Sequence, residues 1–258
     1  MATPELASGV GLLRLEWEAD RSAWVFDTEP QERFVHWDWS QCSRWDARYT
    51  DVLGIEGDGE RTTGERTFDW IAPADDVLAD LDARAAGSDA RLLDVGCGNS
   101  LFCEVAAAAG LMRLVGVDYS RPVVDAMTAR ALERGLQERV SYCCSDVARM
   151  PYADASFDVI VDKGCCDAAL TAWDHCAMQR RLKRPVSAEL EERAERAAAL
   201  AASFVLEYAR VLRGGGTLLL YSYEEPQGRA CWFAEQRCWQ VRQQPARDGN
   251  YLYECTRV

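Results

Sequence analysis

The fold that we expect is decided by the stretch Leu92-Leu93-Asp94-Val95-Gly96-Cys97-Gly98-Asn99. Its apolar start predicts a buried strand, and its two glycines predict a sharp turn at the carboxyl end of that strand. Glycine lets the backbone come close to a ligand, and backbone amides at such a turn suit a nucleotide-like ligand. A dinucleotide fingerprint would need a third glycine at position 101, where this chain has Leu101, so NAD and FAD are disfavoured.

From residue 91 onward, short apolar runs alternate with longer helical patterns, which is typical of a parallel α/β sheet. Ser187 is a suitable N-cap for a long helix, and the glycines 214–216 are expected to end that helix. The expected strands are 91–95, 114–118, 140–144, 157–162, 217–223, 238–242 and 251–256, and other helices are expected at 100–110, 122–134 and 228–236. We therefore predict an α/β fold with a Rossmann-like, seven-stranded, mostly parallel sheet, helices on both faces and an antiparallel terminal hairpin strand.

Residues 1–44 are expected to form an N-terminal extension, and residues 45–258 the main domain. Six of the nine tryptophans fall in the first 90 residues, at positions 17, 24, 37, 39, 45 and 70. So many large aromatic side chains are rarely all exposed to solvent. We therefore expect this part of the chain to form a cap that packs on the sheet domain.

Composition and charge restrict the partners and the compartment that we expect. The formal net charge is −13, which disfavours nonspecific binding to nucleic acid or an anionic membrane and suits a basic protein partner. The eleven cysteines are an odd number, and no secretory signal precedes them, so we expect free thiols in a reducing, cytoplasmic setting. Adjacent pairs such as Cys143-Cys144 lack the spacer of a zinc knuckle, so no metal is expected.

Polar residues follow the next three expected strands at their carboxyl ends. Asp118 lies 22 residues after Gly96, where a carboxylate can accept hydrogen bonds from both ribose hydroxyls of an adenosine; the alternative is a helix N-cap. Tyr119 can pack on the adenine, and Asp146 with Val147 can meet its edge through a side-chain oxygen and a backbone amide. The fourth strand ends at Asp162-Lys163-Gly164. Because ligands bind at the carboxyl ends of strands in open α/β sheets, this joint pattern indicates a class I methyltransferase with S-adenosylmethionine as cofactor.

The chain also resembles the methyltransferase-like family of class I protein lysine methyltransferases, whose members modify elongation factor 1-alpha or citrate synthase. The resemblance covers roughly residue 44 to the C-terminus, and two of its runs are specific to that family. These are Trp45-Asp46-Ala47-Arg48-Tyr49 and Asp162-Lys163-Gly164 with Asp167-Ala168. Further matching runs are Phe68-Asp69-Trp70, 95–100, 117–120, 155–159 and 210–212.

The resemblance implies roles for individual residues. Trp45 and Tyr49 would fold over the cofactor, with Tyr49 near the methionine carboxylate, and Lys163 would form the floor of the crevice. The other implied cofactor-binding residues are Gly96, Gly98, Asp118, Tyr119, Asp146 and Val147. The chain departs from the family at Cys165 and Cys166, where threonine and leucine are usual, and in the segment 173–186, which carries four basic residues at 180–184.

The predicted reaction is methyl transfer to a lysine of a basic, elongation factor-like protein. Such a displacement depends mainly on alignment and desolvation, and Asp162 is the candidate to accept a proton from the lysine or to orient it. Two alternatives stay open at this point: a methyltransferase for a small molecule, and a noncatalytic cofactor-binding scaffold.

Overall fold

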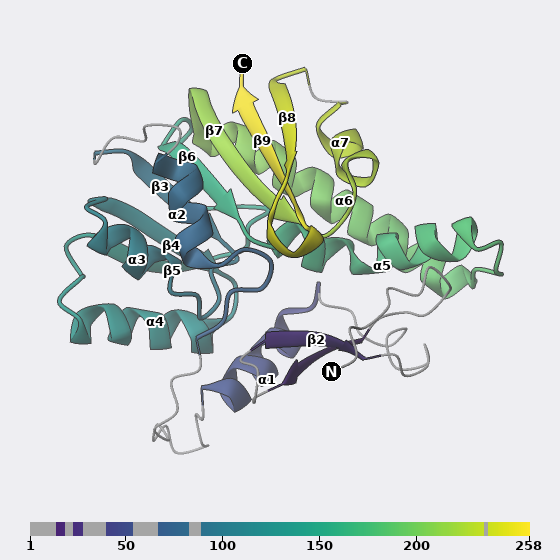
Figure 1. Cartoon of the computed structure of the whole chain (residues 1–258), viewed down its shortest axis with the longest axis horizontal. Coiled ribbons are helices and arrows are strands. Elements are labelled where there is room, and N and C mark those ends of the chain that lie inside the picture. Colours follow the sequence, from purple (N-terminus) through teal and green to yellow (C-terminus); the bar gives the residue numbers. More distant parts are fainter. Residues whose placement is uncertain (1–13, 19–22, 28–39, 54–66, 83–88, 235–236) are drawn as a thin grey trace.

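The computed structural model describes residues 14–18, 23–27, 40–53, 67–82, 89–234 and 237–258. Seven strands form the main sheet: β3 (Arg91–Val95), β4 (Arg113–Asp118), β5 (Val140–Cys144), β6 (Phe157–Asp162), β7 (Leu212–Ser222), β8 (Trp239–Pro245) and β9 (Tyr251–Arg257). Their spatial order is β5-β4-β3-β6-β7-β9-β8 (Figure 1). The pairings from β5 to β7 are parallel, whereas β9 runs antiparallel to both β7 and β8. The expected mostly parallel sheet with an antiparallel terminal strand is confirmed.

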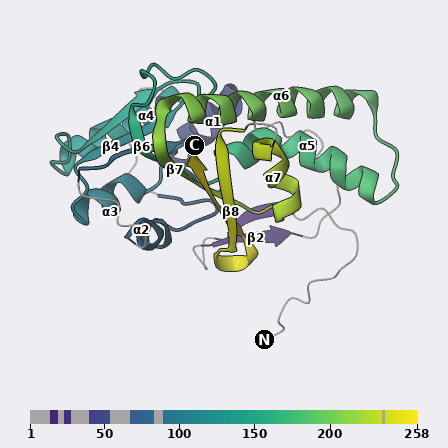
Figure 2. The same ribbon diagram turned by 90° about the horizontal axis from the view of Figure 1, so that it is seen from above.

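Helices cover both faces of this sheet, as expected. They are α1 (Cys42–Val52), α2 (Ala74–Asp82), α3 (Phe102–Ala108), α4 (Arg121–Glu133), α5 (Cys165–Arg181), α6 (Ala188–Val211) and α7 (Pro226–Ala234). Successive strand residues point to opposite faces, so Leu92 packs with side chains of α2 and α3, whereas Leu93 packs with side chains of α5 and α6. Figure 2 shows α5 and α6 on one side of the sheet and α2 and α3 on the other. Two apolar cores therefore hold the strand ends in place.

The boundaries of α6 and β7 show where the sequence interpretation was right and where it was wrong. Ser187 is the N-cap of α6, because its hydroxyl accepts a hydrogen bond from the amide of Leu190 at 3.2 Å. The glycines 214–216 do not end the helix, which stops at Val211; they lie inside β7. The pairing of β6 with β7 shifts register there, and Gly215 has a φ of +72°. The glycines therefore form an irregularity in the strand.

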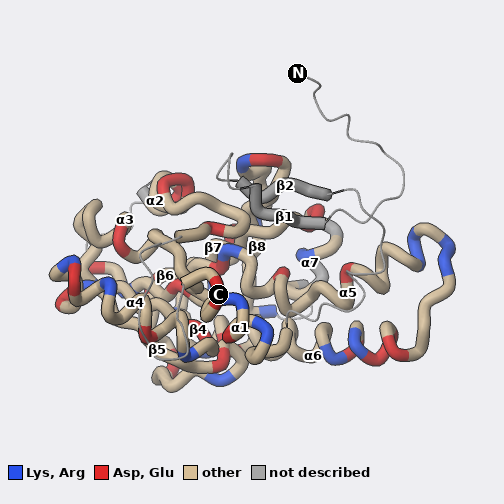
Figure 3. The backbone as a smooth tube through the Cα atoms, turned by 90° about the horizontal axis from the view of Figure 1, so that it is seen from below, with Lys and Arg blue, Asp and Glu red and all other residues tan. Residues whose placement is uncertain are grey.

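Helices α5 and α6 form a hairpin that carries the basic run 180–184 at its outer end (Figure 3). Arg180 forms an ion pair with Glu191 at 3.0 Å, and both side chains are exposed. Exposed pairs of this kind contribute little to stability. In the described part of the chain, no helix is both long and apolar enough to cross a membrane.

The N-terminal region contributes one short sheet and one helix to the described residues. β1 (Arg14–Glu18) and β2 (Ala23–Asp27) pair as antiparallel strands. Helix α1 packs against α4, where Trp45 and Tyr49 join a small apolar core with Val123, and Trp70 packs against the same core. Tryptophans 37 and 39 lie outside the described residues, so the expected cap can be followed only in the described parts of the first 90 residues.

Candidate functional site

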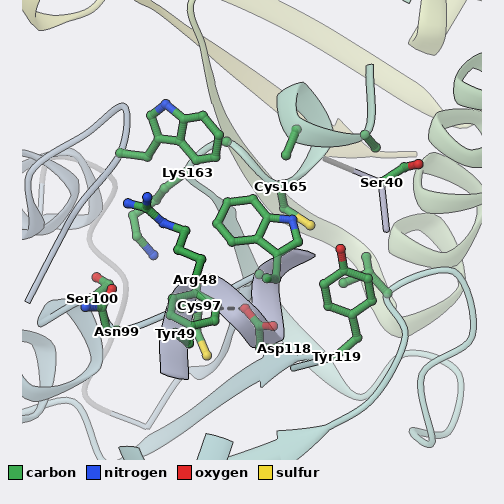
Figure 4. Close-up of a pocket in the computed structure, with 18 of the residues that line it drawn as sticks. Ser40, Arg48, Tyr49, Cys97, Asn99, Ser100, Asp118, Tyr119, Lys163 and Cys165 are labelled. Carbon is green, nitrogen blue, oxygen red and sulfur yellow. Dashed lines mark hydrogen bonds between the residues drawn. The ribbon is translucent and has the colours of Figure 1, made fainter. Parts of the chain in front are cut away.

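A cavity opens at the carboxyl ends of β3, β4 and β6, beside α1 (Figure 4). With its open mouth it spans about 950 Å³, part of which is open solvent. All nine residues that were predicted to bind the cofactor line it: Trp45, Tyr49, Gly96, Gly98, Asp118, Tyr119, Asp146, Val147 and Lys163. The structure thus brings together residues that are spread over about 120 positions of the sequence. Their roles in binding stay predictions.

The turn after β3 requires glycine at two positions. Gly96 has a φ of +58°, and a Cβ atom there would lie 2.6 Å from the Cβ of Cys165. Gly98 has a φ of +51°, and a Cβ atom there would lie 2.5 Å from the hydroxyl oxygen of Tyr49. Residues with side chains rarely adopt such φ values, and neither position has room for one. Cys165 and Tyr49 therefore pack directly against the backbone of this turn, and both glycines line the cavity.

Asp118, the last residue of β4, connects the turn to the start of α4. Its carboxylate accepts hydrogen bonds from the amides of Gly98 at 3.1 Å and Ser120 at 2.9 Å. A carboxylate has about four acceptor positions, so two are left for a ligand. Burial raises the pKa of Asp118 to about 6, although these hydrogen bonds oppose the shift. The carboxylate is ionised at neutral pH and can accept hydrogen bonds from paired hydroxyl groups.

Helix α1 forms an aromatic wall over this turn. The rings of Trp45 and Tyr49 stack with their centroids 5.6 Å apart, and Trp70 lies 5.5 Å from Trp45. The hydroxyl of Ser120 donates a hydrogen bond of 2.6 Å to the carboxylate of Asp46 and so holds α1 against the start of α4. An aromatic wall of this kind excludes water and favours a cation beside it.

Lys163, which the resemblance implied as the floor of the crevice, lines the cavity. Its amine forms an ion pair with Asp94 and lies 4.8 Å from the centroid of the Phe102 ring. Burial opposes the charged form of this lysine, but the charges of Asp94 and Asp69 raise its pKa above the ordinary value. The amine therefore stays cationic, and Asp94 holds it in place.

Asp162 does not reach the cavity, so the structure does not support the predicted role in proton transfer. This side chain is fully buried, and its carboxylate accepts hydrogen bonds from the amides of Gly164, Cys165 and Cys166 at 3.0, 2.7 and 3.1 Å. A fourth hydrogen bond of 2.9 Å comes from the hydroxyl of Tyr208. All four acceptor positions are therefore used, and the side chain caps the first turn of α5.

Several residues of the cavity were not predicted from the sequence. Cys165, Ala169, Leu200 and Phe204 form an apolar wall next to Val147. Arg48, Asp69 and Trp70 also line the cavity, and they lie in the two aromatic runs that the family resemblance had quoted.

A buried cluster at the end of β7 was also missed. The guanidinium of Arg229 is 1% exposed and lies between two carboxylates, donating to Asp167 at 2.9 Å and to Asp174 at 2.9 and 2.7 Å. Asp167 also accepts a hydrogen bond from Ser222, and Asp174 accepts one from Tyr223. This network joins α5, α7 and the end of β7. It uses Asp167, a residue of the family-specific run, for a structural purpose.

Comparison with known proteins identifies the class of the domain. Residues 86–254 match the protein family described as "Methyltransferase domain". The eEF1A lysine and N-terminal methyltransferase of Bos taurus is 32% identical over 117 residues, which is 45% of this chain and 16% of that protein. The EEF1A lysine methyltransferase 2 of Danio rerio is 30% identical over 128 residues, 48% of this chain and 52% of that protein. The chain thus spans about half or less of the length of these relatives.

Solved structures support the fold. The 1,6-didemethyltoxoflavin-N1-methyltransferase of Burkholderia thailandensis, solved with S-adenosylhomocysteine, superposes with a TM-score of 0.52 at 17% identity. The match covers 84% of this chain and 86% of that one. At this identity the likeness bears on the fold alone.

Proposed function

The chain belongs to the methyltransferase domain family, and on that premise we propose that it is an S-adenosylmethionine-dependent enzyme that methylates a lysine side chain of a protein. The observation that carries the proposal is a cavity lined by every residue of the predicted cofactor pattern, in a chain whose relatives are named as lysine methyltransferases of elongation factor 1-alpha.

The described residues fit S-adenosylmethionine, the cofactor of this class. Asp118 has two acceptor positions for the ribose hydroxyls, and Gly96 and Gly98 of the glycine turn line the cavity beside it. The apolar wall at Val147, Leu200 and Phe204 suits the faces of an adenine ring. The ribose and the adenine therefore each have a matching surface.

The chemistry that we propose depends on position and exclusion of water. S-adenosylmethionine supplies an activated methyl group on a positively charged sulfur. The aromatic wall of Trp45, Tyr49 and Trp70 shields the reacting groups from solvent, and Lys163 is kept away from the reaction by its ion pair with Asp94. Alignment of an amine with the methyl group then provides most of the acceleration. No base is assigned, since the carboxylate of Asp162 is fully used by the first turn of α5.

Charge favours a protein substrate with a basic surface. The net charge of −13 attracts a positively charged surface that carries the target lysine. The relatives make elongation factor 1-alpha the first substrate to test, and a factor of translation would place the enzyme in the cytoplasm.

The test is labelling with radioactive S-adenosylmethionine. We expect label in purified elongation factor 1-alpha, or in one protein band of a cell lysate, and mass spectrometry should assign it to a lysine. Asp118→Asn serves as the control and should abolish most of the label. Label that appears only in the small-molecule fraction would support a small-molecule methyltransferase instead, and absence of label despite tight cofactor binding would support a scaffold.

A further inference from the structure

The carboxylate of the methionine portion of the cofactor still needs a positively charged partner in this site. The ribose and adenine surfaces described above do not supply one, and the amine of Lys163 is already paired with Asp94. We propose that the guanidinium of Arg48 binds this carboxylate. The proposal rests on the cofactor alone and does not depend on which substrate is methylated.

Arg48 lies at the correct end of the cavity. It is half-buried on α1, between Trp45 and Tyr49, and it lines the cavity. Its guanidinium carbon lies 5.8 Å from the centroid of the Phe68 ring, and the amide of Phe68 contacts the carbonyl oxygen of Asn99 at 3.4 Å. These two contacts place the guanidinium near the far side of the glycine turn.

The orientation of the cofactor follows from the positions of the other lining residues. In Figure 4, Tyr119 lies on one side of the cavity, whereas Arg48, Asn99 and Ser100 lie on the other. If the ribose binds at Asp118 and the adenine at Tyr119, the methionine portion extends past the glycine turn toward Arg48. A carboxylate at that end would meet the guanidinium directly.

The charges of the lining support the same assignment. Among the described residues that line the cavity, the positive ones are Arg48 and Lys163, and the acidic ones are Asp69, Asp118 and Asp146. Asp69 lies at the methionine end, where it accepts hydrogen bonds from the hydroxyl of Ser100 and, at 3.3 Å, from the amide of Ala74. A ligand carboxylate beside Asp69 would be repelled without a nearby cation. Arginine suits this task, because its planar guanidinium group can donate two parallel hydrogen bonds to one carboxylate.

The structure also refines the role expected for Tyr49. The family resemblance placed Tyr49 near the methionine carboxylate, but its hydroxyl lies over Gly98. A neutral hydroxyl in that position can add a hydrogen bond, but it cannot balance the charge of the carboxylate. Arg48, the preceding residue on the same helix, can do so.

The test compares two ligands that differ only in the carboxylate. Calorimetry would measure binding of S-adenosylhomocysteine and of its decarboxylated analogue, adenosyl thiopropylamine, to the full chain. Arg48→Met should weaken binding of S-adenosylhomocysteine by tenfold or more, which corresponds to about 1.4 kcal/mol, and should change binding of the analogue by less than twofold. Arg48→Lys should lose less affinity, because lysine keeps the positive charge but cannot donate two parallel hydrogen bonds.

Arg113→Met is the matched control for net charge, because Arg113 is exposed at the start of β4. It should leave the binding of both ligands unchanged. An equal loss for the two ligands in Arg48→Met would overturn the proposal and assign Arg48 to the packing of α1. Unchanged binding of S-adenosylhomocysteine would overturn it as well. Neither result depends on finding the substrate, so a failure of the lysine proposal is seen separately.

Discussion

Buried carboxylates lie at two places along the carboxyl ends of the strands, and their hydrogen bonds differ. At the end of β4, Asp118 accepts two backbone hydrogen bonds and faces the cavity. At the ends of β6 and β7, Asp162 and the pair Asp167–Arg229 are saturated by protein groups. The first arrangement leaves acceptor positions for a ligand, whereas the second leaves none. Position at a strand end therefore does not identify a functional carboxylate; the number of acceptor positions that remain does.

The largest expected effect tests the carboxylates whose acceptor positions are all used by protein groups. Arg229→Met leaves Asp167 and Asp174 buried without their cation, and removing one partner of a buried ion pair costs about 3–5 kcal/mol. Urea denaturation should show a loss of that size in the free energy of unfolding, and Arg113→Met should show almost none. S-adenosylhomocysteine should bind the folded variant as it binds the parent. A large loss of affinity with unchanged stability would mean that the Asp167–Arg229 pair belongs to the ligand site.

The next effect tests Asp118, whose carboxylate keeps acceptor positions for a ligand. Asp118→Asn removes the charge that we expect the ribose hydroxyls to meet, and hydrogen bonds to charged groups are worth about 1.5–3 kcal/mol. Calorimetry should show that S-adenosylhomocysteine binds about ten- to a hundredfold more weakly. Asp146→Asn, at an exposed position of the same cavity, should lose clearly less. If the two variants lose equal affinity, Asp118 has no special role.

A smaller effect separates the two kinds of carboxylate directly. Asp162→Asn disturbs the cap of α5, so the free energy of unfolding should fall by about 1–2 kcal/mol. Tyr208→Phe, which removes one of the same hydrogen bonds, should lose part of that amount. The pH dependence of methyl transfer should not change in Asp162→Asn. A shifted pH profile with intact stability would restore Asp162 as a group that takes part in proton transfer.

The smallest effect is a pH dependence of binding. The pKa of Asp118 is raised by burial to about 6, and the ribose hydroxyls should bind its ionised form. Affinity for S-adenosylhomocysteine should therefore be nearly full at pH 7, about half at pH 6 and about tenfold lower at pH 5. Burial also raises the pKa of Asp162 to about 6, but this group does not face the cavity. Asp118→Asn should therefore remove the pH dependence, and Asp162→Asn should keep it.

The sequence was sufficient for the sheet and for nine of the residues that line the cavity. Apolar runs end at polar residues in β3, β4 and β6, and the glycines of the turn have few other uses in such a place. The role of Asp162 could not be predicted, because its partner Tyr208 lies 46 residues away and the identity of a donor is set by packing. Arg229 was missed for the same reason, since it lies 62 residues after Asp167. Local patterns predict elements and strand ends, whereas saturation of a buried group depends on distant side chains.

The position of α1 has a consequence for the time that a ligand stays bound. Residues 86–254 match the methyltransferase domain, yet the wall over the glycine turn comes from residues 42–52, which precede that match. Tyr49 lies against Gly98, and Ser120 holds the helix through Asp46. A ligand that contacts this wall should leave more readily when the helix moves. We therefore expect Ser120→Ala to shorten the residence time of S-adenosylhomocysteine, measured by stopped-flow displacement, more than it slows its association.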